Sequence, residues 1–74
     1  MTLDELLPGQ ACVVRDVHLE GAVLQRLLDM GFVEGARIEV VRNAPLLDPI
    51  DIRIRNNLIA VRRSEAGGIE VERV

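Results

Sequence analysis

An uninterrupted alternation of isoleucine and charged residues between positions 50 and 55 limits the fold of this chain more than any other feature. The inward set is Ile50, Ile52 and Ile54, and the outward set is Asp51, Arg53 and Arg55. A period of two belongs to a β-strand, whose successive side chains point to opposite faces. Because a slip of one residue would bury three charges, the sequence predicts a strand of defined register with one buried face.

Four more segments have the β-branched content or the alternation of strands, and turn residues separate them. They are Gln10–Val17, Arg37–Arg42, Leu58–Val61 and Ile69–Glu72. In the first segment, Ala11, Val13 and Val17 are expected to share one face. Asn56-Asn57 is expected to close a two-residue hairpin, since Asn tolerates positive φ.

Helical spacing of apolar residues occurs once, between Glu20 and Met30, and predicts the only substantial helix. Gly31 is expected to end this helix in the left-handed conformation, with Phe32 folded back onto the last turn. Thr2 and Glu5 have the spacing of a capping box and predict one short helical turn near the start. The stretch Ser64–Gly68 is expected to be a polar, Gly-rich turn.

These elements predict an all-β fold, a small SH3-like barrel of about five strands with one intervening helix and a short N-terminal helical turn. A closed barrel is favoured because closure removes the exposed edges of an open sheet. A chain of 74 residues can build only one compact core. Residues 1–74 are therefore expected to form a single domain.

Composition argues against several classes of partner. A net charge of −3 offers no general attraction to a phosphate backbone, and Phe32 is the single aromatic residue, so nucleic-acid binding is not expected. The first ten residues carry Asp4 and Glu5 and are expected to be neither a signal peptide nor a membrane span. Cys12 is the one cysteine, which suits a reducing compartment and predicts a cytoplasmic protein without direct membrane insertion.

No constellation of residues points to catalysis, so the chain is not expected to be an enzyme. The carboxylates form no acid–base couple, and the glycines have no phosphate-binding spacing. Cys12 is expected to be a small core residue and His18 a solvated one. Asp48 is expected to form a turn by accepting hydrogen bonds from nearby amides. No cofactor and no bound metal are expected.

Three stretches follow the pattern of a known family in order and spacing: Leu28–Gly35, Val40–Ile50 and Val61–Ala66. They resemble the FeoA family, whose pattern runs from a helix ending in Met-Gly through Ala-Pro-Leu-Gly-Asp-Pro-Ile, a hairpin and Leu-Arg-Arg to a closing strand. Two positions depart from it. Leu47 stands where the family usually has Gly, and Glu34 where it usually has Pro.

The resemblance implies an SH3-like barrel that acts as a cytosolic accessory of FeoB, a ferrous-iron transporter with a GTP-binding domain, and modulates its activity. FeoB would recruit the protein to the inner face of the membrane. The alternative is a regulatory domain like the SH3-like barrel of iron-dependent transcriptional repressors, although no helix-turn-helix segment is present here. A metallochaperone would need several clustered ligands, and the candidates are scattered.

Four residues are candidates for partner binding: Leu46, Leu47, Arg53 and Arg55. Leu46 and Leu47 are adjacent apolar residues in a loop between two prolines, where exposure would cost free energy that a partner could recover. Leu47 is favoured as the exposed residue, whereas Leu46 is at least as well explained as a plug at one end of the barrel. Arg53 and Arg55 could face an acidic partner surface, and self-association is a further possibility.

Overall fold

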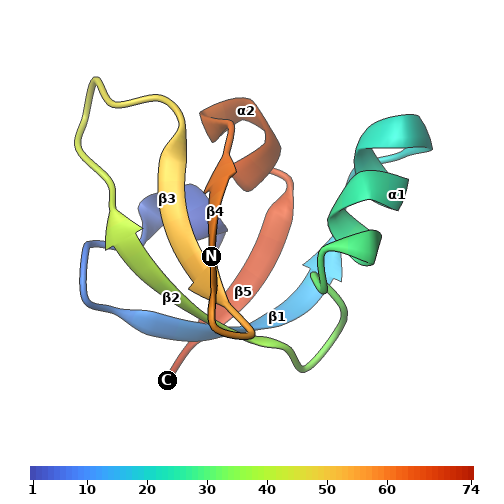
Figure 1. Cartoon of the computed structure of the whole chain (residues 1–74), viewed down its shortest axis with the longest axis horizontal. Helices are drawn as coiled ribbons and strands as arrows, with labels where there is room; N and C mark the ends of the chain where they lie inside the picture. Colours follow the sequence, from blue (N-terminus) through green and yellow to red (C-terminus); the bar gives the residue numbers. More distant parts are fainter.

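The computed structural model describes residues 1–74. Its elements are a short 3-10 helix at Leu3–Glu5 followed by β1 (Ala11–Val17), α1 (Gly21–Asp29), β2 (Arg37–Arg42), β3 (Ile50–Ile54), β4 (Asn57–Val61), α2 (Arg63–Ala66) and β5 (Ile69–Arg73) (Figure 1). The strands form one antiparallel sheet in the order β4-β3-β2-β1-β5. The predicted all-β fold with one substantial helix is confirmed.

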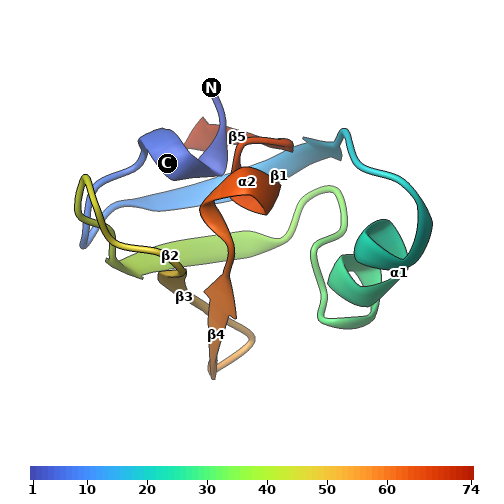
Figure 2. The same ribbon diagram turned by 90° about the horizontal axis from the view of Figure 1, so that it is seen from above.

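The sheet is not closed into a continuous hydrogen-bonded barrel. β4 and β5 are the two ends of the strand order, and no pairing joins them. Figure 2 shows α2 between these two strands, and its Ala66 belongs to the hydrophobic core. The expectation that closure removes the sheet edges is therefore wrong, because the chain passes from β4 to β5 through a helical turn and the two strands do not pair.

One cluster of 15 buried hydrophobic residues makes the core. Ile50, Ile52 and Ile54 of β3 are all buried, as their alternation predicts, and so are Ile38 and Val40 of β2. Burial of a side chain of this size contributes about 1.5–3 kcal/mol to the free energy of folding. Apolar side chains on the inner face of the sheet therefore hold the domain together.

The predicted face of β1 is wrong. Cys12 and Val14 are buried, whereas Val13 is only partly so. The pairing of β1 with β5 shifts register between Val14 and Asp16, so that Arg15 is an extra residue in β1. This bulge reverses the alternation, and Val17 comes to the same side as Val14.

Two predicted turns are also corrected. The hairpin between β3 and β4 turns at Arg55 and Asn56, with φ of 52° and 66°, and Asn57 already belongs to β4. The predicted turn at Asn56-Asn57 is therefore one residue too late, because Arg55 adopts the positive φ expected of Asn57. In the stretch Ser64–Gly68, the expected polar turn is a helical one, α2, which starts at Arg63.

The end of α1 follows the prediction. Gly31 has φ of 106°, its N–H donates to the Leu28 carbonyl at 3.0 Å, and the Phe32 N–H donates to the Leu27 carbonyl at 3.0 Å. These two bonds form a Schellman motif. Phe32 and Leu27 are both completely buried, so the chain folds back as expected.

Candidate functional site

The segment of residues 43–49 between β2 and β3, here named the Leu46 loop, exposes the side chain that most needs a partner. Leu46 is 100% exposed, whereas Leu47 is only partly exposed. The prediction that Leu47 is the exposed residue and Leu46 a plug is therefore wrong. The Leu47 N–H donates to the Ala44 carbonyl at 2.9 Å, which closes a turn with Leu46 at its tip.

Arg63, the first residue of α2, stabilises this loop through hydrogen bonds of its side chain. Its Nε and Nη2 donate to the Leu47 carbonyl at 3.1 and 2.8 Å, and Nη2 also donates to the Ala44 carbonyl at 2.7 Å. A further bond from Nη2 reaches Asn43 Oδ1 at 2.7 Å. One planar guanidinium thus satisfies acceptors along the whole loop. This role of Arg63 was not predicted from the sequence, because its partners are distant in the chain.

Asn43 and Asp48 attach the two ends of the Leu46 loop to the rest of the molecule. Asn43 Nδ2 donates to the carbonyls of Asp4 and Leu6 at 3.0 and 2.6 Å. Asp48 Oδ1 accepts from the Arg63 backbone N–H at 2.9 Å. Asp48 does bond to an amide, as predicted, but to one in α2 rather than in its own turn. Since both ends of the loop are attached, a partner that covers Leu46 would bind a loop that is already ordered, and little conformational entropy would be lost on binding.

The predicted arginines lie elsewhere. The Leu46 loop precedes β3, whereas Arg53 is near the other end of that strand and Arg55 lies in the following turn (Figure 1). The structure therefore separates the four predicted contact residues into two groups. A polar depression of about 270 Å³ surrounds the second group, and its lining consists of Arg37, Glu39, Arg53, Arg55 and Asn56.

Within this depression, Arg53 Nη1 donates to Glu39 Oε1 at 3.2 Å, which offsets one positive charge. Arg37 and Arg55 make no ion pair. The end of the Arg55 side chain packs beside Gly31, where an added Cβ would lie 3.1–3.3 Å from Nε, Cζ and Cδ of Arg55. Two unpaired guanidinium groups could therefore face an acidic group of a partner.

A second depression, of about 320 Å³, lies between α1 and β1 and was not predicted from the sequence. Its apolar lining includes Leu24 and Leu28 of α1 and the neighbouring Val33. Leu28 and Val33 are partly exposed there. The sequence contains a signal for it, since Leu24 and Leu28 are four residues apart and therefore lie on one face of the predicted helix. In the structure, only Leu27 of α1 is fully buried.

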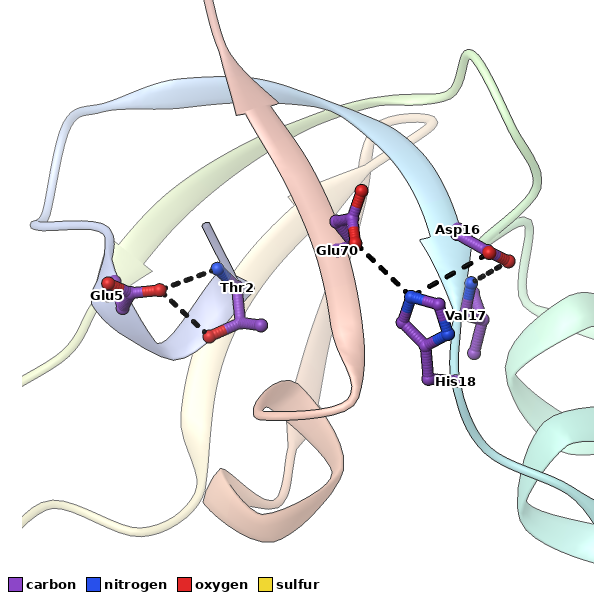
Figure 3. A network of polar contacts seen from close by, with 6 residues as sticks. All are labelled: Thr2, Glu5, Asp16, Val17, His18 and Glu70. Atoms are coloured by element: carbon purple, nitrogen blue, oxygen red, sulfur yellow. Dashed lines mark hydrogen bonds and ion pairs between the residues drawn. The ribbon is translucent and has the colours of Figure 1, made fainter.

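His18 belongs to a surface cluster of polar groups (Figure 3). Its Nε2 lies 3.2 Å from Glu70 Oε1 and 3.7 Å from Asp16 Oδ2, and all three side chains are more than half exposed. This exposure agrees with the solvated role predicted for His18. No group of three or more His, Cys, Asp or Glu side chains is arranged to hold a metal ion.

Cys12 is completely buried on the inner face of β1. Burial raises the pKa of its thiol to about 11, because the surrounding apolar side chains disfavour the thiolate. A protonated thiol is neither a nucleophile nor a good metal ligand. The prediction that Cys12 is a small core residue is confirmed. No helix in the structure has the length and apolar character needed to cross a membrane.

Comparison with known proteins agrees with the family resemblance. The family model described as the FeoA domain matches residues 1–73. The chain is 44% identical over 72 residues to a Fe(2+) transport protein A/Fe(2+) transporter FeoB fusion protein of Porphyromonas gingivalis. That match covers 97% of this chain and 8% of the fusion protein, so the chain corresponds to a small part of that relative.

Solved structures show the same fold. The FeoA protein from Chlorobium tepidum is 44% identical with a TM-score of 0.92, over 100% of this chain and 70% of the other. A zinc complex of Stenotrophomonas maltophilia FeoA, described as an SH3 domain protein, is 33% identical with a TM-score of 0.86. That match covers 97% of this chain and 89% of the other. The predicted SH3-like fold is thus confirmed. A manganese-dependent transcriptional repressor matches over 41% of its chain with a TM-score of 0.88 but only 16% identity, which shows a shared fold alone.

Proposed function

Because this chain belongs to the FeoA family, we propose that it is an accessory protein of ferrous-iron uptake that binds the cytosolic part of a FeoB transporter and modulates its activity. The Porphyromonas gingivalis relative, whose name joins both partners in one chain, supports this association. A covalent link raises the local concentration of two modules that act together. The protein would act by contact and contribute no chemistry of its own.

The observation that carries the proposal is the fully exposed Leu46 on a loop whose two ends are attached. A partner that buries a leucine side chain gains about 1.5–3 kcal/mol. The Arg63 hydrogen bonds to the loop carbonyls have already restricted the backbone, so less of this gain is lost to ordering. We therefore assign Leu46 as the main contact and Leu47 as its support.

Arg53 and Arg55 form a separate element of the proposal. Their depression lies at the far end of β3, so one small partner segment cannot cover it together with Leu46. Arg37 and Arg55 offer unpaired charge there, and Arg53 is partly neutralised by Glu39. We expect these arginines to affect the association rate and its salt dependence more than the final affinity.

The protein would act in the cytoplasm, and its partner would recruit it to the inner face of the membrane. The alternative, a regulatory domain of the repressor class, rests on the shared fold only. The identity of 16% to the manganese-dependent repressor carries no functional argument. The fusion with FeoB in a relative of 44% identity therefore favours the transport role.

The test is Leu46→Asp, compared with the parent for thermal stability and for binding to the cytosolic part of the cognate transporter by titration calorimetry. We expect an unchanged melting temperature, because Leu46 buries nothing in the free protein. Affinity should fall at least about tenfold, the equivalent of 1.4 kcal/mol.

Val74→Asp is the matched control, since Val74 is an exposed apolar residue at the end of the chain marked C, which lies away from the Leu46 loop in Figure 1. It should leave affinity unchanged. Leu47→Asp should lower the melting temperature, because Leu47 is partly buried. Parental affinity in Leu46→Asp would remove the loop from the interface, and absence of binding by the parent would refute the association itself.

A further inference from the structure

The two edges of the sheet differ in how well they are protected. On the β5 side, the Val71 N–H donates to the Met1 carbonyl at 2.8 Å, and Thr2 forms a β-bridge with Glu70. β5 also carries the charged residues Glu70, Glu72 and Arg73. Pairing with the first residues of the chain and charges on the strand both discourage the addition of another strand.

β4 has none of these protections. It contains no charged residue, no proline and no bulge, and its register with β3 is continuous from Asn57 to Val61. Leu58 is 62% exposed. An uncharged, regular edge strand with exposed apolar side chains is a template for another strand.

The backbone of β4 offers four free hydrogen-bonding groups. The two-residue turn at Arg55 and Asn56 makes Ile54 and Asn57 the hydrogen-bonded pair that closes the hairpin. Along an antiparallel ladder, hydrogen-bonded pairs alternate with pairs that are not hydrogen-bonded. Leu58 and Ala60 belong to the second kind, so their N–H and C=O groups point away from β3. No backbone bond outside the sheet ladders uses these groups, whereas the next outward N–H, that of Arg62, donates to Glu65 Oε1 at 3.3 Å.

We propose that this edge pairs with the β4 strand of a second copy of the chain. In an antiparallel arrangement with the two-fold axis at Ile59, Leu58 of each copy lies opposite Ala60 of the other. Each such pair exchanges two backbone hydrogen bonds, so all four free groups of each copy find a partner. The two sheets would become one continuous sheet across an isologous interface.

The side chains of β4 suit a copy of themselves. The larger Leu58 meets the small Ala60 on the outer face, and Ile59 meets its own equivalent on the inner face. Asn57 faces Val61, so no like charges are opposed. An unrelated peptide would gain the same backbone bonds but not this matched register, and for that reason the structure favours self-pairing.

A pairing of five residues buries far less than the roughly 1,200 Å² of a stable interface, so the dimer should be transient and dependent on concentration. The test combines sedimentation velocity with amide NMR spectra of the parent over a dilution series up to about 1 mM, where dissociation constants of this order are visible. We expect the average mass to rise with concentration. The amide signals of Leu58 and Ala60 should shift most, because their N–H groups form the new bonds.

Ala60→Pro should abolish the association. It removes an outward N–H and leaves the β3–β4 ladder intact, since proline is tolerated on an edge strand where its nitrogen faces away from the ladder. Leu58→Glu keeps every backbone donor and lies opposite Arg53 within the monomer. In the dimer it places two carboxylates at diagonal positions across the new strand pair, where like charges repel. It should weaken self-association at least tenfold, and it keeps the proposal testable if Ala60→Pro fails to fold.

Leu46→Asp is the control, because it alters the other exposed leucine and leaves β4 untouched. It should leave self-association unchanged. A parent that stays monomeric throughout the series would overturn the proposal, and so would association that is lost in Leu46→Asp but kept in Leu58→Glu. A monomeric parent whose binding to the transporter is weakened by Ala60→Pro would instead assign the edge to a strand of that partner.

Discussion

Gly31 is the residue on which the end of α1 depends. Its φ of 106° is strained for any residue with a Cβ, and an added Cβ would also lie 3.1–3.3 Å from atoms at the end of the Arg55 side chain. Gly31 therefore has two structural roles: it ends the helix, and it leaves space for the side chain of Arg55, which lines the polar depression.

We expect Gly31→Val to lower the free energy of unfolding by about 1 kcal/mol or more, since the left-handed conformation alone costs an L-residue this much. Gly35→Val is the matched control, because Gly35 has φ of 89° but no heavy atom within 4 Å of an added Cβ. Denaturant unfolding should show the larger loss for Gly31→Val. Equal losses would mean that contact with Arg55 contributes nothing.

Cys12 shows how burial determines chemistry at one atom. With its pKa raised to about 11 from an ordinary 9.0, the folded protein keeps the thiol protonated where the unfolded chain begins to lose its proton. The contribution of the buried, protonated thiol to the free energy of unfolding is fully present below pH 9 and is lost as the pH rises toward 11. The native thiol should therefore be unreactive at neutral pH.

We expect a thiol reagent to label Cys12 only as fast as the protein unfolds, and labelling to accelerate in denaturant. Stability of the parent should also decline between pH 9 and 11 more than that of Cys12→Ala or Cys12→Val, which cannot ionise there. Rapid stoichiometric labelling of the native protein at pH 7 would show that the thiol is accessible and the burial argument wrong.

Among the secondary-structure elements, the short helix α2 contacts both the Leu46 loop and α1. Arg63 holds the Leu46 loop, and Glu65, which is buried, forms an ion pair with Arg26 of α1. α1 lies at one side of the sheet in both views (Figures 1 and 2), with Leu27 as its one fully buried residue. A helical turn of four residues thus connects the loop proposed for docking with the only long helix.

We expect Arg63→Lys to loosen the Leu46 loop, because an ammonium group cannot donate in the planar pattern that reaches the Ala44 and Leu47 carbonyls together. Loss of charge-assisted hydrogen bonds should reduce stability by about 1–3 kcal/mol. Binding to the transporter should weaken as well, and amide relaxation at Leu46 should report greater mobility.

Arg73→Lys is the control for this change, because Arg73 is exposed and makes no side-chain hydrogen bond or ion pair. It should match the parent in stability and mobility. An Arg63→Lys variant with a rigid loop and parental affinity would show that the two attached loop ends suffice without the guanidinium.

For the whole molecule, the proposed contacts are distributed so that they need not compete. The Leu46 loop and the arginine depression are at opposite ends of β3, and the free backbone groups lie along β4. One copy could therefore contact a transporter through its loop while its β4 edge pairs with a second copy. A small domain with a single core can present several surfaces because its sheet curves around that core.

Features that depend on neighbouring residues could be predicted from the sequence. The alternation of Ile50, Ile52 and Ile54 predicted a buried face, and Met30-Gly31-Phe32 predicted the end of α1, because periodicity and φ preferences act locally. The order of such elements also predicted an SH3-like fold, whereas the family was inferred from the resemblance of Leu28–Gly35, Val40–Ile50 and Val61–Ala66 to its pattern.

Three features depend on the assembled fold: which leucine of the loop is exposed, which face of β1 is buried and which sheet edge stays free. The hydrogen bonds of Arg63 to the Leu47 carbonyl hold the loop, and the bulge opposite β5 turns Val17 inward. The edge of β4 at Leu58 and Ala60 is free because no strand pairs with it. Hydrogen bonds between distant residues cannot be read from periodicity, because the energy that selects them exists only once the sheet has assembled.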